Sequence, residues 1–217
     1  MLDEESCRRR QEEEGVMWKL ILGFSIAVSA AGTAAGAIVP IGPFDGDKAE
    51  GFETQPPFQF ERSYDVFGSQ GVVQQLGAGQ GLHITTSWSF FGLVFPHSGT
   101  YFMGGAGVNA EWVFDLPALR FGGYFTTNAD VPDAVAEFFD ADNNSLGILP
   151  VAAPLNGAWT WNGWETDGAG IKRIEIVSNN VFNGFIMHDD MQYTPIPAPG
   201  VLALVGLTGL IAGRRRR

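Results

Sequence analysis

Apolar and polar residues alternate in short runs from about residue 50 to residue 194, and turn-forming residues separate these runs. A period of two is typical of a strand with one buried face, and no long run in this region shows the 3.6-residue period of a helix. The 29 glycines and 12 prolines of the chain also favour short strands and turns. We therefore expect an all-β body.

The expected strands are rich in β-branched and aromatic residues, and they cover residues 82–88, 108–114, 119–126, 135–140, 171–177 and 184–193. Turns are expected at residues 140–144, 162–163, 167–168 and 179–180. About nine or ten strands at this spacing predict a jelly-roll-like β-sandwich, with an up-and-down barrel as the alternative.

The body is strongly acidic. Between Ile38 and Pro199 the chain carries five basic and 18 acidic residues, a net charge of −13. A nucleic-acid-binding surface needs a basic footprint, so we expect no nucleic-acid partner. The single cysteine, Cys7, excludes an intrachain disulfide.

The N-terminal segment has the pattern of an export signal. Residues 17–37 begin with Met17-Trp18-Lys19, continue with an apolar run, and end with Ala35-Gly36-Ala37. This three-part order predicts a signal peptide that is helical until cleavage, with Ala35 and Ala37 as the cleavage residues and the export translocon and signal peptidase as partners. Residues 1–16 are charged and precede the expected start at Met17, so we interpret them as a mis-assigned or disordered extension.

The C-terminal segment has the pattern of a second targeting signal. Residues 195–200 are rich in proline, residues 201–213 are uncharged and mostly apolar, and four arginines end the chain. An apolar helix followed by arginines predicts a short transmembrane segment in the inner membrane, with the preceding domain outside.

This tail resembles the PEP-CTERM sorting signal. The resemblance covers about residues 195–217, with Pro197-Ala198-Pro199 where the family has Pro-Glu-Pro, and it rests also on the terminal arginines Arg214, Arg215, Arg216 and Arg217. It implies an exosortase-like protease as processing partner and a location in the cell envelope or the extracellular matrix. The body, residues 38–194, is similar to the jelly-roll bodies that precede such tails.

The jelly-roll resemblance also implies a structural calcium ion between early acidic residues and the last strand. The candidate ligands are Glu53, Asp189 and Asp190, with Asp45 or Asp47 as further candidates. Adjacent strand residues point to opposite faces, so only one of Asp189 and Asp190 should face inward. A second acidic run, Asp140 to Asn144, lacks the glutamate that ends an EF-hand loop, and a hairpin turn is its simpler interpretation.

Three of the six tryptophans, Trp159, Trp161 and Trp164, gather in six residues. Exposed indole rings at this spacing are typical of a surface that stacks on sugars, and the alternative is that they fill the core.

Catalytic motifs are not evident. The three histidines are scattered, and no nucleophile elbow or phosphate-binding loop is present. We therefore expect an exported, non-catalytic protein of the envelope or matrix. The first alternative is a carbohydrate-binding module that uses the three tryptophans on an extracellular polysaccharide. A polysaccharide hydrolase, with Asp189 and Glu165 as an acid–base pair, is the second.

Overall fold

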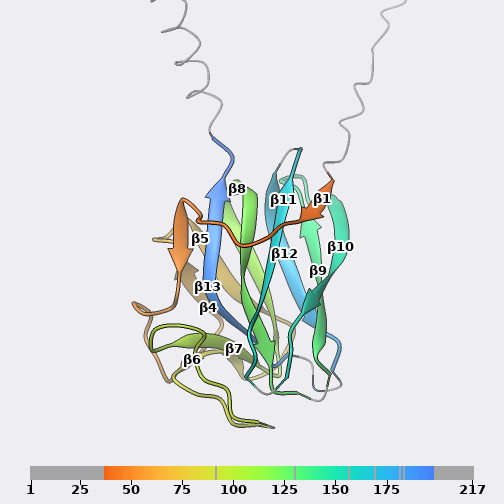
Figure 1. Cartoon of the computed structure of the whole chain (residues 1–217). Coiled ribbons are helices and arrows are strands. Elements are labelled where there is room, and N and C mark those ends of the chain that lie inside the picture. Colours follow the sequence, from red (N-terminus) through yellow and green to blue (C-terminus); the bar gives the residue numbers. More distant parts are fainter. Residues whose placement is uncertain are drawn as a thin grey trace, which may run out of the picture. The chain divides into compact units, whose positions relative to one another are not determined.

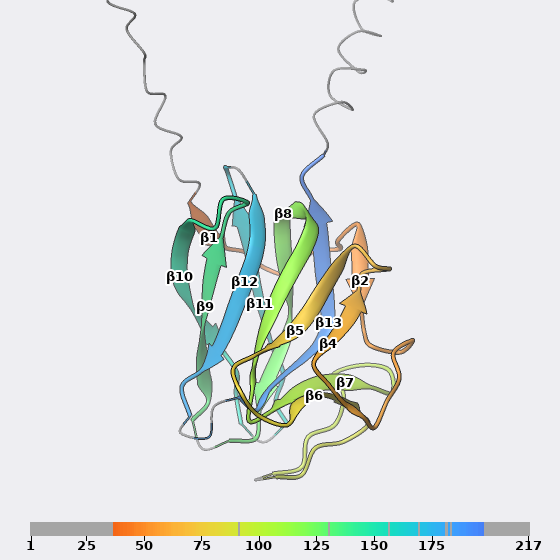
Figure 2. The same cartoon turned by 180° about the vertical axis from the view of Figure 1, so that it is seen from behind.

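The computed structural model describes residues 37–197 except for residues 91, 130, 156, 169, 181 and 183. Within this part all regular elements are strands, thirteen in number, and every pairing between them is antiparallel. The strands form two facing layers (Figures 1 and 2), which confirms the all-β sandwich. The expected signal segment and the apolar tail lie outside the described residues, apart from Ala37 and residues 195–197.

One layer, here called sheet I, has the order β4-β5-β8-β12-β9-β10. Its strands are β4 (Ser63–Val66), β5 (Gly71–Leu76), the first part of β8 (Asn109–Thr127), β12 (Ile171–Ser178), β9 (Asp133–Phe139) and β10 (Ser145–Ala152).

The other layer, sheet II, has the order β1-β11-β8-β13, and β2 and β7 lie along successive parts of β13. A ribbon of β6 and β3 extends it beyond β7. Its strands are β1 (Ile38–Pro40), β11 (Thr160–Thr166), the second part of β8, β13 (Ile186–Pro195), β2 (Lys48–Glu50), β7 (Phe102–Ala106), β6 (Gly81–Thr85) and β3 (Phe60–Glu61).

Strand β8 belongs to both layers. Its first residues pair with β5 and β12, and its last residues pair with β11 and β13. Pro117 lies between the two halves, where no ladder N–H is required of it. The expectation of two separate strands at 108–114 and 119–126 was therefore wrong, because the strand bends from one layer into the other without a turn.

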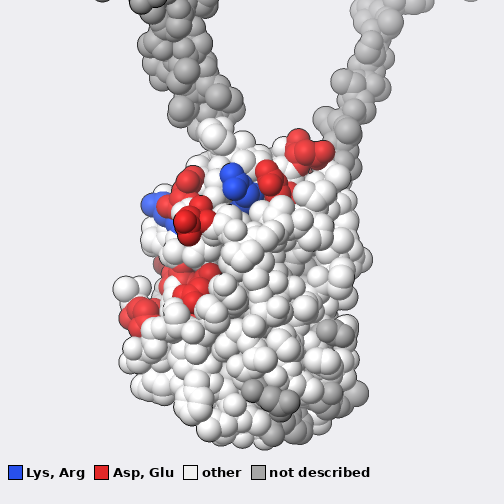
Figure 3. All heavy atoms as spheres, in the orientation of Figure 1, with Lys and Arg blue, Asp and Glu red and all other residues white. Residues whose placement is uncertain are grey.

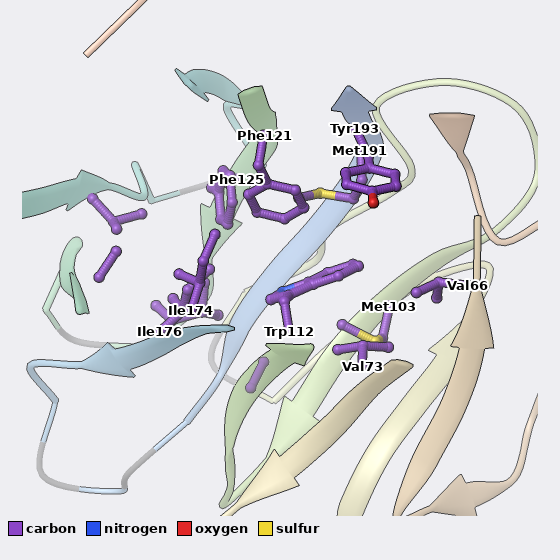
Figure 4. Close-up of a cluster of buried hydrophobic side chains, with 14 of the residues drawn as sticks. Val66, Val73, Met103, Trp112, Phe121, Phe125, Ile174, Ile176, Met191 and Tyr193 are labelled. Carbon is purple, nitrogen blue, oxygen red and sulfur yellow. The ribbon is translucent and has the colours of Figure 1, made fainter. Parts of the chain in front are cut away.

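The core lies between the layers. Figure 4 shows Trp112 among apolar side chains from both sheets, and its ring is fully buried against Phe67, Phe121 and His188. A smaller cluster of Val94, Phe102 and Met187 lies on the outer face of sheet II, where the segment between β6 and β7 covers it. Burial of this apolar surface is the main stabilising contribution to the fold.

Two bulges set which side chains face the core. The register of β12 shifts between Ile171 and Arg173, and this shift brings Ile171 into the core together with Ile174 and Ile176. Strict alternation along the strand would place Ile171 on the opposite face from Ile174, and the bulge is what brings both into the core. The second bulge, in β13, lies at the candidate site.

Charged residues are unevenly distributed over the sandwich. Strand β1 and the end of β13 lie at the same end of the molecule (Figures 1 and 2). On the face drawn in Figure 3, the acidic and basic side chains that are described lie in the half of the body toward that end. The sequence explains this in part, because residues 66–110 contain no Asp, Glu, Lys or Arg. Among the described residues, no helix is long and apolar enough to cross a membrane.

Candidate functional site: an aromatic row on sheet II

The outer face of sheet II carries five ring side chains in continuous contact, here called the aromatic row: Trp159, His97, Tyr124, Trp161 and Phe44. The imidazole of His97 stacks on Tyr124 with ring centroids 3.6 Å apart, and it meets Trp159 edge-on at 6.2 Å. On the other side, Trp161 contacts Tyr124 at 5.5 Å and Phe44 at 5.6 Å. The rings are partly exposed, so the row presents apolar surface to solvent.

Strand pairing explains why these rings meet. Tyr124 of β8 and Trp161 of β11 are direct partners in the ladder, so their side chains share a face. Phe125 and Trp164, on the same two strands, face inward and are buried in the core. Alternation along each strand therefore separates the row from the core.

Two glycines let the indole of Trp161 lie against the sheet. A Cβ atom would come within 2.7 Å of the indole at Gly122 and within 2.6 Å at Gly163. Because glycine has no side chain, the ring settles on the backbone, and its Nε1 donates a hydrogen bond to the carbonyl of Ile41 at 3.1 Å. The orientation of Trp161 is therefore set before any ligand arrives.

A hollow of about 250 Å³ opens beside this indole, lined by Pro43, Phe44, Asp45, Tyr124, Trp161, Asp190 and Gln192. The rings supply apolar walls, and Asp45, Asp190 and Gln192 supply oxygen and nitrogen atoms for hydrogen bonds. A hydrogen bond orients the side chain of Gln192, since its Oε1 accepts from the N–H of Gly46 at 3.0 Å. A flat apolar ring beside a few polar groups fits the two chemical faces of a sugar.

Carboxylates hold the loop that carries His97. The Oδ2 atom of Asp189 accepts hydrogen bonds from the N–H groups of His97 (2.8 Å) and Ser98 (3.3 Å). Asp190 accepts from the Ser98 hydroxyl at 2.8 Å and contacts Nδ1 of His97 at 2.6 Å. Glu53 accepts from the N–H groups of Thr100 and Tyr101. These bonds fix the loop, and with it the stacking of His97 on Tyr124.

The second bulge explains how adjacent aspartates serve the same loop. The register of β13 shifts between Asp189 and Gln192, and Asp190 adopts a left-handed backbone with φ of 48°. His188 points into the core and Asp189 points outward, but the loop buries Asp189 completely. The expectation was that one aspartate would face inward, but it is the loop on the outer face, and not the core, that encloses Asp189. Asp190 remains partly exposed at the hollow.

Burial raises the pKa of Asp189 to about 7, and the neighbouring charge of Asp190 adds to this rise. The backbone N–H groups that donate to its carboxylate act in the opposite direction. Because it is enclosed and bonded to backbone, Asp189 does not face the hollow as a catalytic acid or base would.

The structure brings together two of the three expected tryptophans. Trp161 lines the hollow. Trp159 lies at one end of the aromatic row, and its Nε1 donates a hydrogen bond to the carbonyl of Phe95 at 3.0 Å. Trp164 is only 2% exposed and packs on Phe138, so its assignment to the glycan-binding surface was wrong. The reason is parity, because an odd separation along one strand places Trp161 and Trp164 on opposite faces. The turn expected at Asn162-Gly163 does not exist, since both residues lie within β11.

Sequence reasoning missed Tyr124, Phe44 and His97. Each comes from a different segment, and only the strand register and the path of the loop place them beside Trp161. Residues 119–126 were expected to form a strand, but no local signal in the sequence identifies the neighbours of Tyr124 across the sheet.

The calcium prediction finds no support in the geometry. Glu53, Asp189 and Asp190 lie around one loop, and their oxygens accept hydrogen bonds from that loop. In the described part of the chain, no three His, Cys, Asp or Glu side chains are arranged to hold a metal ion. Asp45 lines the hollow, and Asp47 is exposed nearby.

The other acidic run forms the expected turn between β9 and β10. The N–H groups of Asp142 and Asn144 donate to Oδ1 of Asp140, and Asn143 has a φ of 64°. The hydrogen bonds from Asn144 lower the pKa of Asp140 below its usual value.

A second hollow of about 230 Å³ lies beside the ribbon of β3 and β6, and its lining consists of Phe60, His83, Ser87, Trp88, Ser89 and Phe90. Its walls are aromatic, and its lining contains no carboxylate, amide, lysine or arginine side chain. The hollow at Trp161 has more polar groups with which to orient a sugar, so we take it as the main candidate.

The fold and this surface define a β-sandwich domain with an aromatic, partly polar hollow on one flank. No protein-family model matches the chain, and no curated protein sequence matches it. Among solved structures, the K2 cleaved adhesin domain of Lys-gingipain is similar, with a TM-score of 0.45 and 13% identity over 67% of this chain and 98% of that one.

Two further solved structures are similar to the chain over comparable lengths. TmCBM61, solved in complex with β-1,4-galactotriose, has a TM-score of 0.42 and 17% identity over 67% of this chain and 94% of that chain. A DUF4465 family protein from Bacteroides caccae has a TM-score of 0.39 and 9% identity over 71% of this chain and 97% of that chain. These similarities concern the fold alone.

Proposed function

We propose that this chain is an exported, non-catalytic protein of the cell envelope or extracellular matrix, whose jelly-roll-like body binds polysaccharide through the aromatic row. The observation that carries the proposal is the pre-set indole of Trp161 beside Asp45, Asp190 and Gln192. Sugars present an apolar C–H face and a rim of hydroxyl groups, and the hollow offers a partner for each.

The ends of the body support an anchored arrangement. Strand β1 and the end of β13 lie at one end of the sandwich, so the expected signal and tail segments both join the body there (Figure 1). The aromatic row lies on a flank of the sandwich and remains accessible when that end is held at a membrane. In this proposal the Pro197-Ala198-Pro199 tail is the sorting signal on which an exosortase-like protease acts.

Replacement of Trp161 by alanine is expected to weaken glycan binding by about tenfold or more, because an aromatic side chain that the ligand covers supplies much of the energy of such a contact. The full-length chain in mild detergent would be screened against immobilised neutral and charged oligosaccharides, and the best ligand measured by titration calorimetry. Trp88→Ala, which removes an indole from the second hollow, is the matched control and should bind like the parent. Equal affinities for the parent and Trp161→Ala would refute the proposed site.

Export is tested separately by mass spectrometry of the envelope, medium and cytosol fractions. We expect the mature N-terminus at Ile38 and the protein in the envelope or medium. A full-length chain with both ends intact, found only in the cytosol, would contradict the export and sorting part of the proposal.

A further inference from the structure

The hollow at Trp161 has an unbalanced electrostatic character. Two carboxylates, Asp45 and Asp190, line it, and no lysine or arginine side chain does. Arg120 is nearby in the fold, but its guanidinium lies over the ring of Phe44, 5.5 Å from the ring centroid, and does not line the hollow. The body around the hollow carries a net charge of −13, so the surrounding field has the same sign.

The two carboxylates are available in different ways. Asp190 is held in place by His97 and Ser98, so its charge stays at one edge of the hollow. Asp45 lies at another position of the lining and is exposed. Its side chain does not hold the loop as that of Asp190 does. A cationic group that enters the hollow is therefore attracted by both, and an anionic group is repelled by both.

The indole favours the same sign of charge. The face of a tryptophan ring is negative, and it attracts an ammonium group more strongly than the other aromatic rings do. Tyr124, which contacts Trp161 at 5.5 Å, adds a second ring of the same character. A protonated amine on a sugar ring can thus contact an indole and a carboxylate in one pose, while the apolar face of the sugar stacks beside it.

Resting on the proposed function, we propose that this hollow selects amino sugars with a free, protonated amine over neutral sugars, and that it discriminates against uronic acids. The ligand class is a polysaccharide with de-N-acetylated hexosamine units. In this proposal the aromatic row contributes the part of the affinity that is common to all sugars. The two carboxylates contribute the difference in affinity between cationic, neutral and anionic sugars.

The experiment compares four trisaccharides by titration calorimetry at pH 6 and low salt: glucosamine trimer, its fully N-acetylated form, cellotriose and galacturonate trimer. The probe protein is the full-length chain in mild detergent. We expect the glucosamine trimer to bind about fivefold or more tighter than cellotriose, because an exposed charge pair contributes on this order. The N-acetylated trimer should lose the preference, and the galacturonate trimer should bind most weakly. The preference should fall in 0.5 M salt, since exposed charges are screened.

The variant that isolates the preference is Asp45→Asn, which keeps shape and hydrogen-bonding capacity but removes the charge. We expect it to reduce the ratio of glucosamine-trimer affinity to cellotriose affinity by roughly threefold to fivefold, and this ratio, rather than the affinity for cellotriose alone, is the quantity to compare. Asp47→Asn is the matched control, because Asp47 is exposed two residues away, outside the lining, and its replacement removes the same net charge. It should leave the ratio unchanged.

The outcomes separate this inference from the proposed function. Equal binding of the glucosamine trimer and cellotriose, tightest binding of the galacturonate trimer, or equal effects of Asp45→Asn and Asp47→Asn would overturn the selectivity while carbohydrate binding stands. Absence of binding for all four probes, or binding that survives Trp161→Ala, would overturn the site itself.

Discussion

Replacing Trp164 by alanine is expected to lower the free energy of unfolding by about 3–5 kcal/mol, the range seen when a large buried aromatic side chain is truncated. Trp164 is 2% exposed, and its indole contacts Phe121, Phe125 and Phe138 with ring centroids 5.2–6.3 Å apart. No neighbouring side chain can fill the space without leaving its own packing position, so a cavity remains.

Trp161→Ala is the matched comparison, because it removes the same side chain from the outer face of the same strand. Its cost to stability should be smaller, about 1–2 kcal/mol, since the ring is partly exposed. Urea unfolding of both variants measures the difference, and glycan binding is measured on the folded protein. Loss of binding in a folded, stable Trp164→Ala variant would show that the site has been placed on the wrong face.

The second large effect concerns how the free energy of unfolding depends on pH. His188 and Asp189, adjacent residues of β13, are expected to change it in opposite directions as the pH falls. Burial lowers the pKa of His188 to about 3, from its usual 6.5, so below pH 6.5 the unfolded chain binds a proton that the folded chain does not. His188 therefore costs stability as the pH falls from 6.5 toward 3. Its Nδ1 atom is buried without a hydrogen-bond partner in the structure, which agrees with a neutral ring in an apolar site.

Asp189 has the opposite sign. Burial raises its pKa to about 7 from its usual 3.8, so between these values the folded chain binds a proton that the unfolded chain does not. Asp189 therefore adds stability as the pH falls from about 7 toward 3.8. Between pH 3.8 and 6.5 the two contributions cancel, each at about 1.4 kcal/mol per pH unit.

Single variants should expose each contribution. From pH 6.5 to 4.5, His188→Met should gain about 3 kcal/mol of stability relative to the parent, and Asp189→Asn should lose about the same. The asparagine also loses hydrogen bonds to the loop, so the slope with pH, rather than the absolute stability, is the quantity to compare. Urea denaturation at three pH values gives the slopes. The double variant should return to the slope of the parent, and single variants with unchanged slopes would show that these groups are not buried as described.

Several elements of the fold were predictable because their signals are local. The segment at 171–177 became β12, and the last expected strand became β13, since β-branched residues and alternation need no distant partner to be recognised. The hairpin at Asp140 was predictable for the same reason, because its side chain bonds to the backbone of the next few residues.

Other elements were not predictable because the deciding contact is remote. Asn162-Gly163 has the composition of a turn, yet Gly163 lies under the indole of Trp161, and the amide of Asn162 bonds to the backbone of Ala152. These contacts keep Asn162 and Gly163 inside β11. The alternation of side chains therefore continues through them, and it places Trp164 on the buried face. The bend of β8 at Pro117 likewise follows from its partners, which change from one layer to the other.

The sequence by itself determined the β class, the acidic character of the body and the alternation within most strands, because these depend on neighbouring residues and on charge counts. The tertiary structure decided which faces became the core and which rings met at the hollow. Phe44, His97, Tyr124 and Trp161 come from four segments, and their contact depends on register, on the bulge at Asp190 and on a loop held by carboxylates. The physical reason is cooperativity. A shift of one residue in pairing moves every side chain of a strand to the other face, and only the packing of all strands together selects one register.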